Sequence, residues 1–461
     1  MSPKPNERVS TTTARAIVRW RRFRRGVRDK LTWNRLYRTT SYLKSALWTV
    51  PIIAIVLELL LTPFLRELDA WLQWRVSGLE VTGAQALYQT VITLTLSFLV
   101  FTFGSLLVAI QIAGGQLTPR IIATTLLRDN VVRYSVGLFV FTLVFAVSAL
   151  NHQEKAVLEI VALLTGVLGV ASIADFLFLI DYAARLLRPV SIVARIGDEG
   201  VAVIKAVYPA PATVLPKDSP ELRPLPPAPT RTVPHEGRSE IVLAVDLPTL
   251  VAAARRHDGA IEFLPQVGDF VAADEPLFAL YGGAVAIDDS VLRATVAFGP
   301  ERTLEQDPMF AFRILVDIAL KALSPAINDP TTGVLAIDQV HRLLRVLGKR
   351  ELHGEVIPDA AGNQRVIFRT PNWDDFVHVA CTEIRACGAN NIQIARRLRA
   401  MLDNLRRTLP EHRHDILRRE LDVLDRTIRT IYTLPEELAL ASVPDPQGLG
   451  GSSRAPVLGP G

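Results

Sequence analysis

The sequence predicts a membrane α-helical domain of four transmembrane helices, followed by a cytoplasmic α+β domain. In that second domain we expect a small β barrel-sandwich-like segment and a C-terminal helical bundle. All of the long apolar runs lie in the first 190 of the 461 residues. Each is at least as long as the roughly 20 residues that a helix needs to cross a bilayer. Core helices of soluble proteins are rarely apolar on every side over this length, which argues against a soluble fold.

The N-terminal arm, 1–45, is strongly basic. Residues 1–47 hold 13 Lys and Arg and 2 Asp and Glu, a net charge of +11 (13 − 2). Interleaved with the arginines are Trp20, Phe23, Trp33 and Tyr37. A basic-aromatic segment beside a first span typically binds anionic lipid headgroups. Segments that bind nucleic acid use the same residue types. The tether to the membrane favours lipid instead, so no nucleic acid is expected as a partner.

The membrane domain, 46–190, should contain spans at about 46–65, 87–113, 134–153 and 157–180. The first run follows about 45 polar residues, so it differs from a cleaved signal peptide and should be retained. Lys and Arg concentrate in the arm, in the loop 114–133 and after the fourth span. Because retained Lys and Arg mark the cytoplasmic side, both termini should be cytoplasmic.

The next segments form a connector. Residues 191–208 have helical apolar spacing and predict a cytoplasmic stalk helix. Residues 209–237 hold nine prolines, which do not fit a helix or a central strand, and predict a linker.

Residues 238–300 read as a β-rich subdomain of short strands between turns. Asp246 should cap a helix over 247–257, with Pro248 in its first turn. The segment from Gly259 to Leu277 resembles the barrel-sandwich folds that carry biotin or lipoate. Those carriers need a lysine, and no Lys lies between Lys217 and Lys321, so no cofactor is expected.

Residues 301–435 should form a helical subdomain. We expect helices from Pro308 to the break at Ser324, over 330–347, and over about 373–387, 390–408 and 411–432, with a hairpin in 351–370. The tail, 436–461, is rich in Pro, Gly and Ser and should be disordered. Cys381 and Cys387 do not share a helix face, so a metal or redox pair is not expected.

Three segments resemble one family. They are Leu315–Thr332 (LVDIALKALSPAINDPTT), Gln111–Arg120 (QIAGGQLTPR) and Gly259–Leu277. They are similar to a family of uncharacterised bacterial membrane proteins, the domain of unknown function 2254, over about 45–435. The resemblance implies four spans in a bacterial plasma membrane and a cytoplasmic C-terminal region, with no established activity. Where it implies His-His after the fourth span, this chain has Asp181-Tyr182, and no metal is expected.

Polar residues inside the spans are candidates for an ion pathway. Ionisable groups in spans are costly and often functional, which singles out Glu58 and Asp175. The second span adds a polar stripe, interrupted by the apolar Val108, from which we select Thr90, Thr93, Ser97, Ser105 and Gln111. Such a stripe can line a pore or pack closely against another helix. Glu58 can equally bond a neighbouring helix, and Asp175 can lie in headgroup water.

Two further groups are candidates for coupling and ligand binding. Gln116, Pro119 and Arg120, where the second span ends, and Asp181, after the fourth, could join the two halves. The segment Gln116–Arg120 could equally be a simple stop of the second span at the membrane interface. The second group is Ser324, Asn328, Asp329, Thr331 and Thr332. It suits an anion site at a helix start or simple capping of that helix by Asn328 or Asp329.

No P-loop, dinucleotide fingerprint, zinc motif or paired catalytic carboxylates occur. The sequence therefore favours a homo-oligomeric ion channel or transporter-like protein with a cytoplasmic regulatory domain. A membrane-anchored scaffold or signalling protein is the alternative, and a lipid-modifying enzyme is a second one.

Overall fold

The computed structural model describes residues 33–72, 80–116, 129–153, 157–186, 188–212, 228–352 and 356–451. The chain divides into two compact units. One unit comprises 1–42, 210–310 and 351–372, and the other comprises 43–209, 311–350 and 373–461. Each unit is described by itself.

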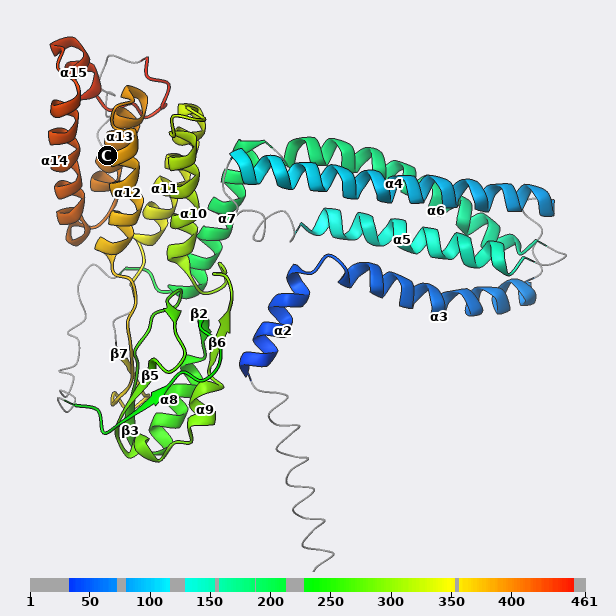
Figure 1. Ribbon diagram of the computed structural model, residues 1–461, viewed down its shortest axis with the longest axis horizontal. Coiled ribbons are helices and arrows are strands. Elements are labelled where there is room, and N and C mark those ends of the chain that lie inside the picture. Colours follow the sequence, from blue (N-terminus) through cyan, green and yellow to red (C-terminus); the bar gives the residue numbers. More distant parts are fainter. Residues whose placement is uncertain are drawn as a thin grey trace, which may run out of the picture. The chain divides into compact units, whose positions relative to one another are not determined.

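Four helices of the second unit are long and apolar enough to cross a membrane, as predicted. They are α3 (Thr49–Leu72), α4 (Val81–Gln116), α5 (Asn130–Asn151) and α6 (Glu159–Leu186), and they lie side by side in Figure 1. The short helix α2 (Trp33–Ser45) precedes them. The predicted spans fall within or close to these helices, each of which continues past at least one end of its predicted span.

The helix α5 packs against each of the other three. Small residues permit close approach, as is common between membrane helices. A side chain at Gly137 of α5 would lie 2.6 Å from Val50 of α3, and one at Gly169 of α6 would lie 2.8 Å from Val91 of α4. Between α4 and α6, the rings of Phe98 and Phe176 stack with centroids 4.2 Å apart.

The rest of this unit is helical. It contains α7 (Pro189–Val207), most of α10 (Pro308–Ala322), α11 (Pro330–Leu347), α12 (Trp373–Gly388), α13 (Ile392–Thr408), α14 (His414–Ile431) and α15 (Pro435–Ala441). The predicted helices are confirmed to within a few residues. Asp329 caps α11, accepting a hydrogen bond from the backbone N–H of Thr332 at 3.1 Å.

The other unit is an α/β region. Its strands are β1 (Arg231–Pro234), β2 (Glu240–Val245), β3 (Gly259–Phe263), β4 (Phe270–Val271), β5 (Pro276–Gly282), β6 (Val296–Gly299), β7 (Val356–Pro358) and β8 (Gln364–Phe368). They form one sheet in the order β1-β5-β3-β8-β7 and another in the order β4-β2-β6. Helix α9 (Asp289–Arg293) is short, and α8 (Leu247–Arg256) is capped by Asp246 as predicted.

The two sheets do not close into a barrel among the described strands, so the barrel-sandwich prediction is not confirmed. The hairpin β7–β8, predicted within 351–370, joins the larger sheet because β8 pairs in parallel with β3. A domain boundary placed at residue 300 therefore differs from the observed packing. The cause is a pairing between segments about a hundred residues apart.

The C-terminal segment also differs from the expected disordered tail. Arg396 of α13 is fully buried and donates hydrogen bonds to the carbonyls of Val443 (3.0 Å) and Gly450 (2.6 Å). The backbone N–H of Gly450 bonds to Asp445 Oδ2 at 2.6 Å. Residues 435–451 are thus ordered by α15 and by α13, and the remainder of the predicted tail lies outside the described residues.

Candidate functional site

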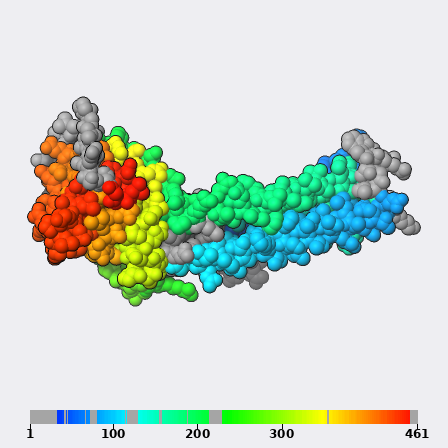
Figure 2. Space-filling model, turned by 90° about the horizontal axis from the view of Figure 1, so that it is seen from above, coloured from blue at the N-terminus to red at the C-terminus, as the bar shows by residue number. Residues whose placement is uncertain are grey.

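The candidate pathway residues of α4 lie mostly on its outer side, whereas Thr95 and Thr102 of the same helix are buried. Thr90, Thr93, Ser97 and Gln111 are exposed, and Ser105 is half-buried. Figure 2 shows α4, coloured from blue to cyan, at the surface of the bundle. Most of these residues therefore lie on the side of α4 that α3, α5 and α6 leave uncovered.

The hydroxyl groups of this stripe donate to their own helix. Thr90 bonds to the carbonyl of Ala86 (2.7 Å), and Ser97 bonds to that of Thr93 (2.8 Å). A side chain at Gly104, on the same exposed side, would meet nothing within 4 Å. We call Thr90, Thr93, Ser97, Gly104 and Gln111 the polar face of α4.

The two acidic candidates lie elsewhere. Glu58 is buried in α3, where Thr62 donates a hydrogen bond to its Oε1 at 2.7 Å. Asp175 of α6 accepts a hydrogen bond from Ser135 of α5 at 3.2 Å. No hydrogen bond among the described residues joins Glu58 to Asp175, and neither belongs to the polar face of α4. One buried oxygen of each carboxyl group has no partner in that part of the chain.

A polar network at one end of the bundle was not found from the sequence. The carboxylate of Asp129 caps α5, accepting from the backbone N–H of Val131 at 2.9 Å. Its Oδ2 also accepts from the Tyr182 hydroxyl of α6 (2.6 Å) and from Arg195 of α7 (2.8 Å). Asp129 is buried, so this one carboxylate connects two apolar helices with the first helix after them. The sequence feature that could have indicated this network is the position of Asp129, a helix-capping residue type directly before an apolar run.

The residues predicted for coupling do not form this network. Asp181 is exposed and pairs with Arg185, one turn along the same helix. Gln116 is the last residue of α4, and Pro119 and Arg120 lie outside the described residues. Tyr182, beside Asp181, makes the contact between helices.

The Ser324–Thr332 segment folds as a loop that caps helices. The Ser324 hydroxyl donates to the carbonyl of Lys321 at 2.7 Å, and the Thr332 hydroxyl donates to Asp329 at 2.5 Å. Asn328 is exposed with a φ of 49°, in the left-handed region that asparagine tolerates. Thr331 is exposed as well. The polar groups of this segment are used mainly within the loop.

The described residues contain no group of three or more His, Cys, Asp or Glu that could hold a metal ion. Cys381 is buried, and burial raises the pKa of its thiol, whereas Cys387 is exposed.

Comparison with known proteins gives the family. Residues 44–404 match the model of a family described as "Predicted membrane protein (DUF2254)". The chain belongs to this family. It is thus a predicted membrane protein with four candidate membrane-spanning helices, as the resemblance of its three segments implied.

The chain is also similar to uncharacterised mycobacterial proteins. A protein of Mycobacterium bovis is 28% identical over 375 residues, covering 77% of this chain and 71% of the relative. Proteins of two Mycobacterium tuberculosis strains are 28% and 27% identical over the same shares of each chain. No solved structure matches the chain.

Proposed function

We propose that this protein is a homo-oligomeric channel or transporter-like protein for a small ion, with a cytoplasmic regulatory part. The observation that carries the proposal is the polar face of α4. In one protomer this face points away from the other membrane helices, so a single copy would expose it to lipid. Lipid-facing positions favour apolar residues, and polar or small residues gather where helices or water meet. Several copies arranged around their α4 helices would remove the polar face from lipid.

The alternative is a membrane-anchored scaffold in which α4 forms only an interface between copies. The self-satisfied hydroxyls favour this reading, because Thr90 and Ser97 need no water to complete a hydrogen bond. Both proposals place the polar face of α4 between protomers. They differ in whether ions pass along it.

Crosslinking tests the shared part. We expect Gly104→Cys, in a Cys387→Ser background, to form disulfide-linked dimers upon mild oxidation in membranes. Val170→Cys in the same background is the matched control, because Val170 is 68% exposed on the outer side of α6. Equal crosslinking of both variants, or of neither, would sink both proposals.

Ion flux separates the two. Full-length protein in liposomes should conduct at least one of K⁺, Na⁺, H⁺ or Cl⁻ under an applied potential. Ser97→Leu should then reduce the flux by about tenfold or more, since a pore lining loses a polar contact. Val170→Leu should leave it unchanged. Specific crosslinking at Gly104→Cys without flux for any of these ions would support the scaffold proposal and reject the transport proposal.

A further inference from the structure

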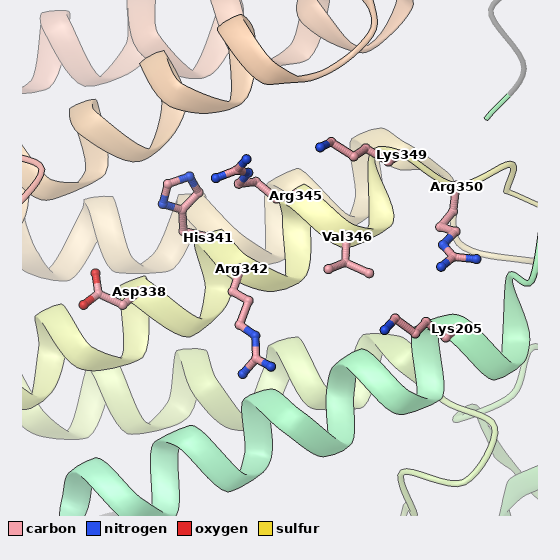
Figure 3. Close-up of a pocket in the computed structure, with 8 residues that line it drawn as sticks. All are labelled: Lys205, Asp338, His341, Arg342, Arg345, Val346, Lys349 and Arg350. Atoms are coloured by element: carbon pink, nitrogen blue, oxygen red, sulfur yellow. The ribbon is translucent and has the colours of Figure 1, made fainter. Parts of the chain in front are cut away.

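A cleft in the helical part of the second unit gathers positive charge. It is lined by Lys205 of α7, by residues of α11 and by the two residues that follow its last turn, and it has a volume of about 490 Å³. The cationic residues that line it are Lys205, Arg342, Arg345, Lys349 and Arg350, which we call the basic cleft. Figure 3 shows Arg342 pointing from α11 toward α7, with Lys205 on the facing side of α7.

Two of these cations are used by the fold. Arg342 forms an ion pair with Asp198 of α7 at 2.7 Å. Arg350 donates to the carbonyl of Pro209 at 2.7 Å and so holds the end of α7. No ion pair or hydrogen bond is found for the side chains of Lys205, Arg345 or Lys349 within the part of the chain that the structure describes.

The other side chains do not neutralise the cleft. Asp338 is the acidic lining residue, and it is already paired with Arg397 at 2.6 Å. Five cations against Asp338 and Asp198 leave a charge of +3 (5 − 2). Burial, and next the charge of Arg397, lower the pKa of His341 to about 4, so this ring is neutral at pH 7.

Helix ends explain only part of this charge. Cations are favoured at helix C-termini, and both α7 and α11 end near the cleft, at Val207 and Leu347. Each end carries about −0.5 charge, so two ends offset about one of the three excess charges. About two positive charges remain for a ligand.

We propose that the basic cleft binds a phosphate-bearing anion. Phosphate oxygens accept paired hydrogen bonds from the planar guanidinium of arginine and are attracted to the compact positive charge of the lysine ammonium. Arg345 is available for the first contact and Lys349 for the second. The volume lies within the roughly 300–1,000 Å³ of small-molecule sites. The phosphate can come from a free metabolite or from a lipid headgroup. This binding does not depend on the proposed transport.

The test uses full-length protein in phosphatidylcholine nanodiscs at physiological ionic strength, which screens weak surface binding. Inorganic pyrophosphate is the probe, and calorimetry measures its affinity. Arg345→Ala/Lys349→Ala should weaken binding by about tenfold or more, because two charge-assisted contacts are lost. Arg255→Ala/Arg256→Ala is the matched control, since it removes an exposed pair from the end of α8 and should leave the affinity unchanged.

A second arm distinguishes the sources. The thermal midpoint of each protein is compared in nanodiscs with and without phosphatidylglycerol. Pyrophosphate binding that only the cleft variant loses supports a free phosphate ligand. If phosphatidylglycerol raises the thermal midpoint of the unchanged protein but not of the cleft variant, and pyrophosphate does not bind, the ligand is a lipid headgroup. No response to either probe, or equal loss in the α8 variant, overturns the proposal.

Discussion

His341 shows how one residue depends on a distant helix. Its Nε2 contacts Asn404 Oδ1 at 2.9 Å, and a guanidinium nitrogen of Arg397 lies 3.1 Å from its Nδ1. These contacts fit a neutral ring that donates from Nε2 and accepts at Nδ1. Burial, the largest cause, and the charges of Arg397 and Arg345 lower the pKa of His341 to about 4.

This pKa predicts an acid-sensitive fold. An unfolded histidine binds a proton below about pH 6.5, whereas His341 in the folded state stays neutral down to about pH 4. Stability contributed by His341 is therefore present above pH 6.5 and is lost as the pH falls toward 4. At pH 5 the loss is about 2 kcal/mol.

The change His341→Gln should remove this sensitivity, because glutamine can still donate to Asn404 and accept from Arg397 without titrating. We expect similar thermal midpoints for both proteins at pH 7 and a higher midpoint for the variant at pH 5. Scanning fluorimetry in detergent measures both. Parallel declines of the two midpoints with pH would contradict the assigned pKa.

Local chemistry made some residues predictable and left others hidden. Asp246 and Asp329 each precede an apolar helical pattern that has a proline in its first turn, and both cap helices as the sequence indicated. The partners of His341 come from α13, 56 and 63 residues further along the chain. No spacing rule within one element identifies such contacts.

At the scale of elements, Asp129 joins α5, α6 and α7 through its cap and its contacts with Tyr182 and Arg195. We predict that Asp129→Ala destabilises the fold by about 2–4 kcal/mol, from the lost cap and charge-assisted hydrogen bonds. A lower midpoint of thermal unfolding in detergent would show it.

Asp181→Ala is the matched control for Asp129→Ala. Asp181 is exposed, and its partner Arg185 belongs to the same helix, so its removal should leave the midpoint unchanged. If both variants melt together, the network does not stabilise the junction of α5, α6 and α7.

The elements also show where composition misleads. Prolines and glycines after residue 443 indicate disorder when counted alone, and yet Arg396 of α13 binds the carbonyls of Val443 and Gly450. The buried Arg396 orders this segment, but the sequence around Arg396 predicts only an ordinary amphipathic helix. The periodic helices from α10 to α14 were predictable because each has a continuous apolar stripe.

For the whole molecule, apolar length alone predicted the four candidate spans, since a bilayer imposes one scale on every helix. The parallel pairing of β8 with β3 was not predictable, because strands so far apart carry no shared local pattern. The polar face of α4 could be predicted from the helical spacing of polar residues along the second span. Its outward direction depends on which sides of α4 the other helices cover.

Orientation in the membrane is the remaining property of the whole molecule, and the distribution of Lys and Arg predicts it. The arm with a net charge of +11 should be cytoplasmic. Crossing four spans then returns the chain to the same side and leaves the turn after α5 outside. His152, at the exposed C-terminal end of α5, and Cys387, exposed on α12, should therefore lie on opposite sides.

A membrane-impermeant maleimide can report both positions. We expect His152→Cys/Cys387→Ser to be labelled in intact cells, and the unchanged chain to be labelled at Cys387 only after the membrane is permeabilised. Buried Cys381, whose thiol pKa is raised by burial, should stay unlabelled in both proteins until they unfold. The reverse pattern would place the basic arm outside, against the rule that Lys and Arg are retained on the cytoplasmic side. Labelling of both positions in intact cells would mean an odd number of crossings, so that one of the four helices does not span the membrane.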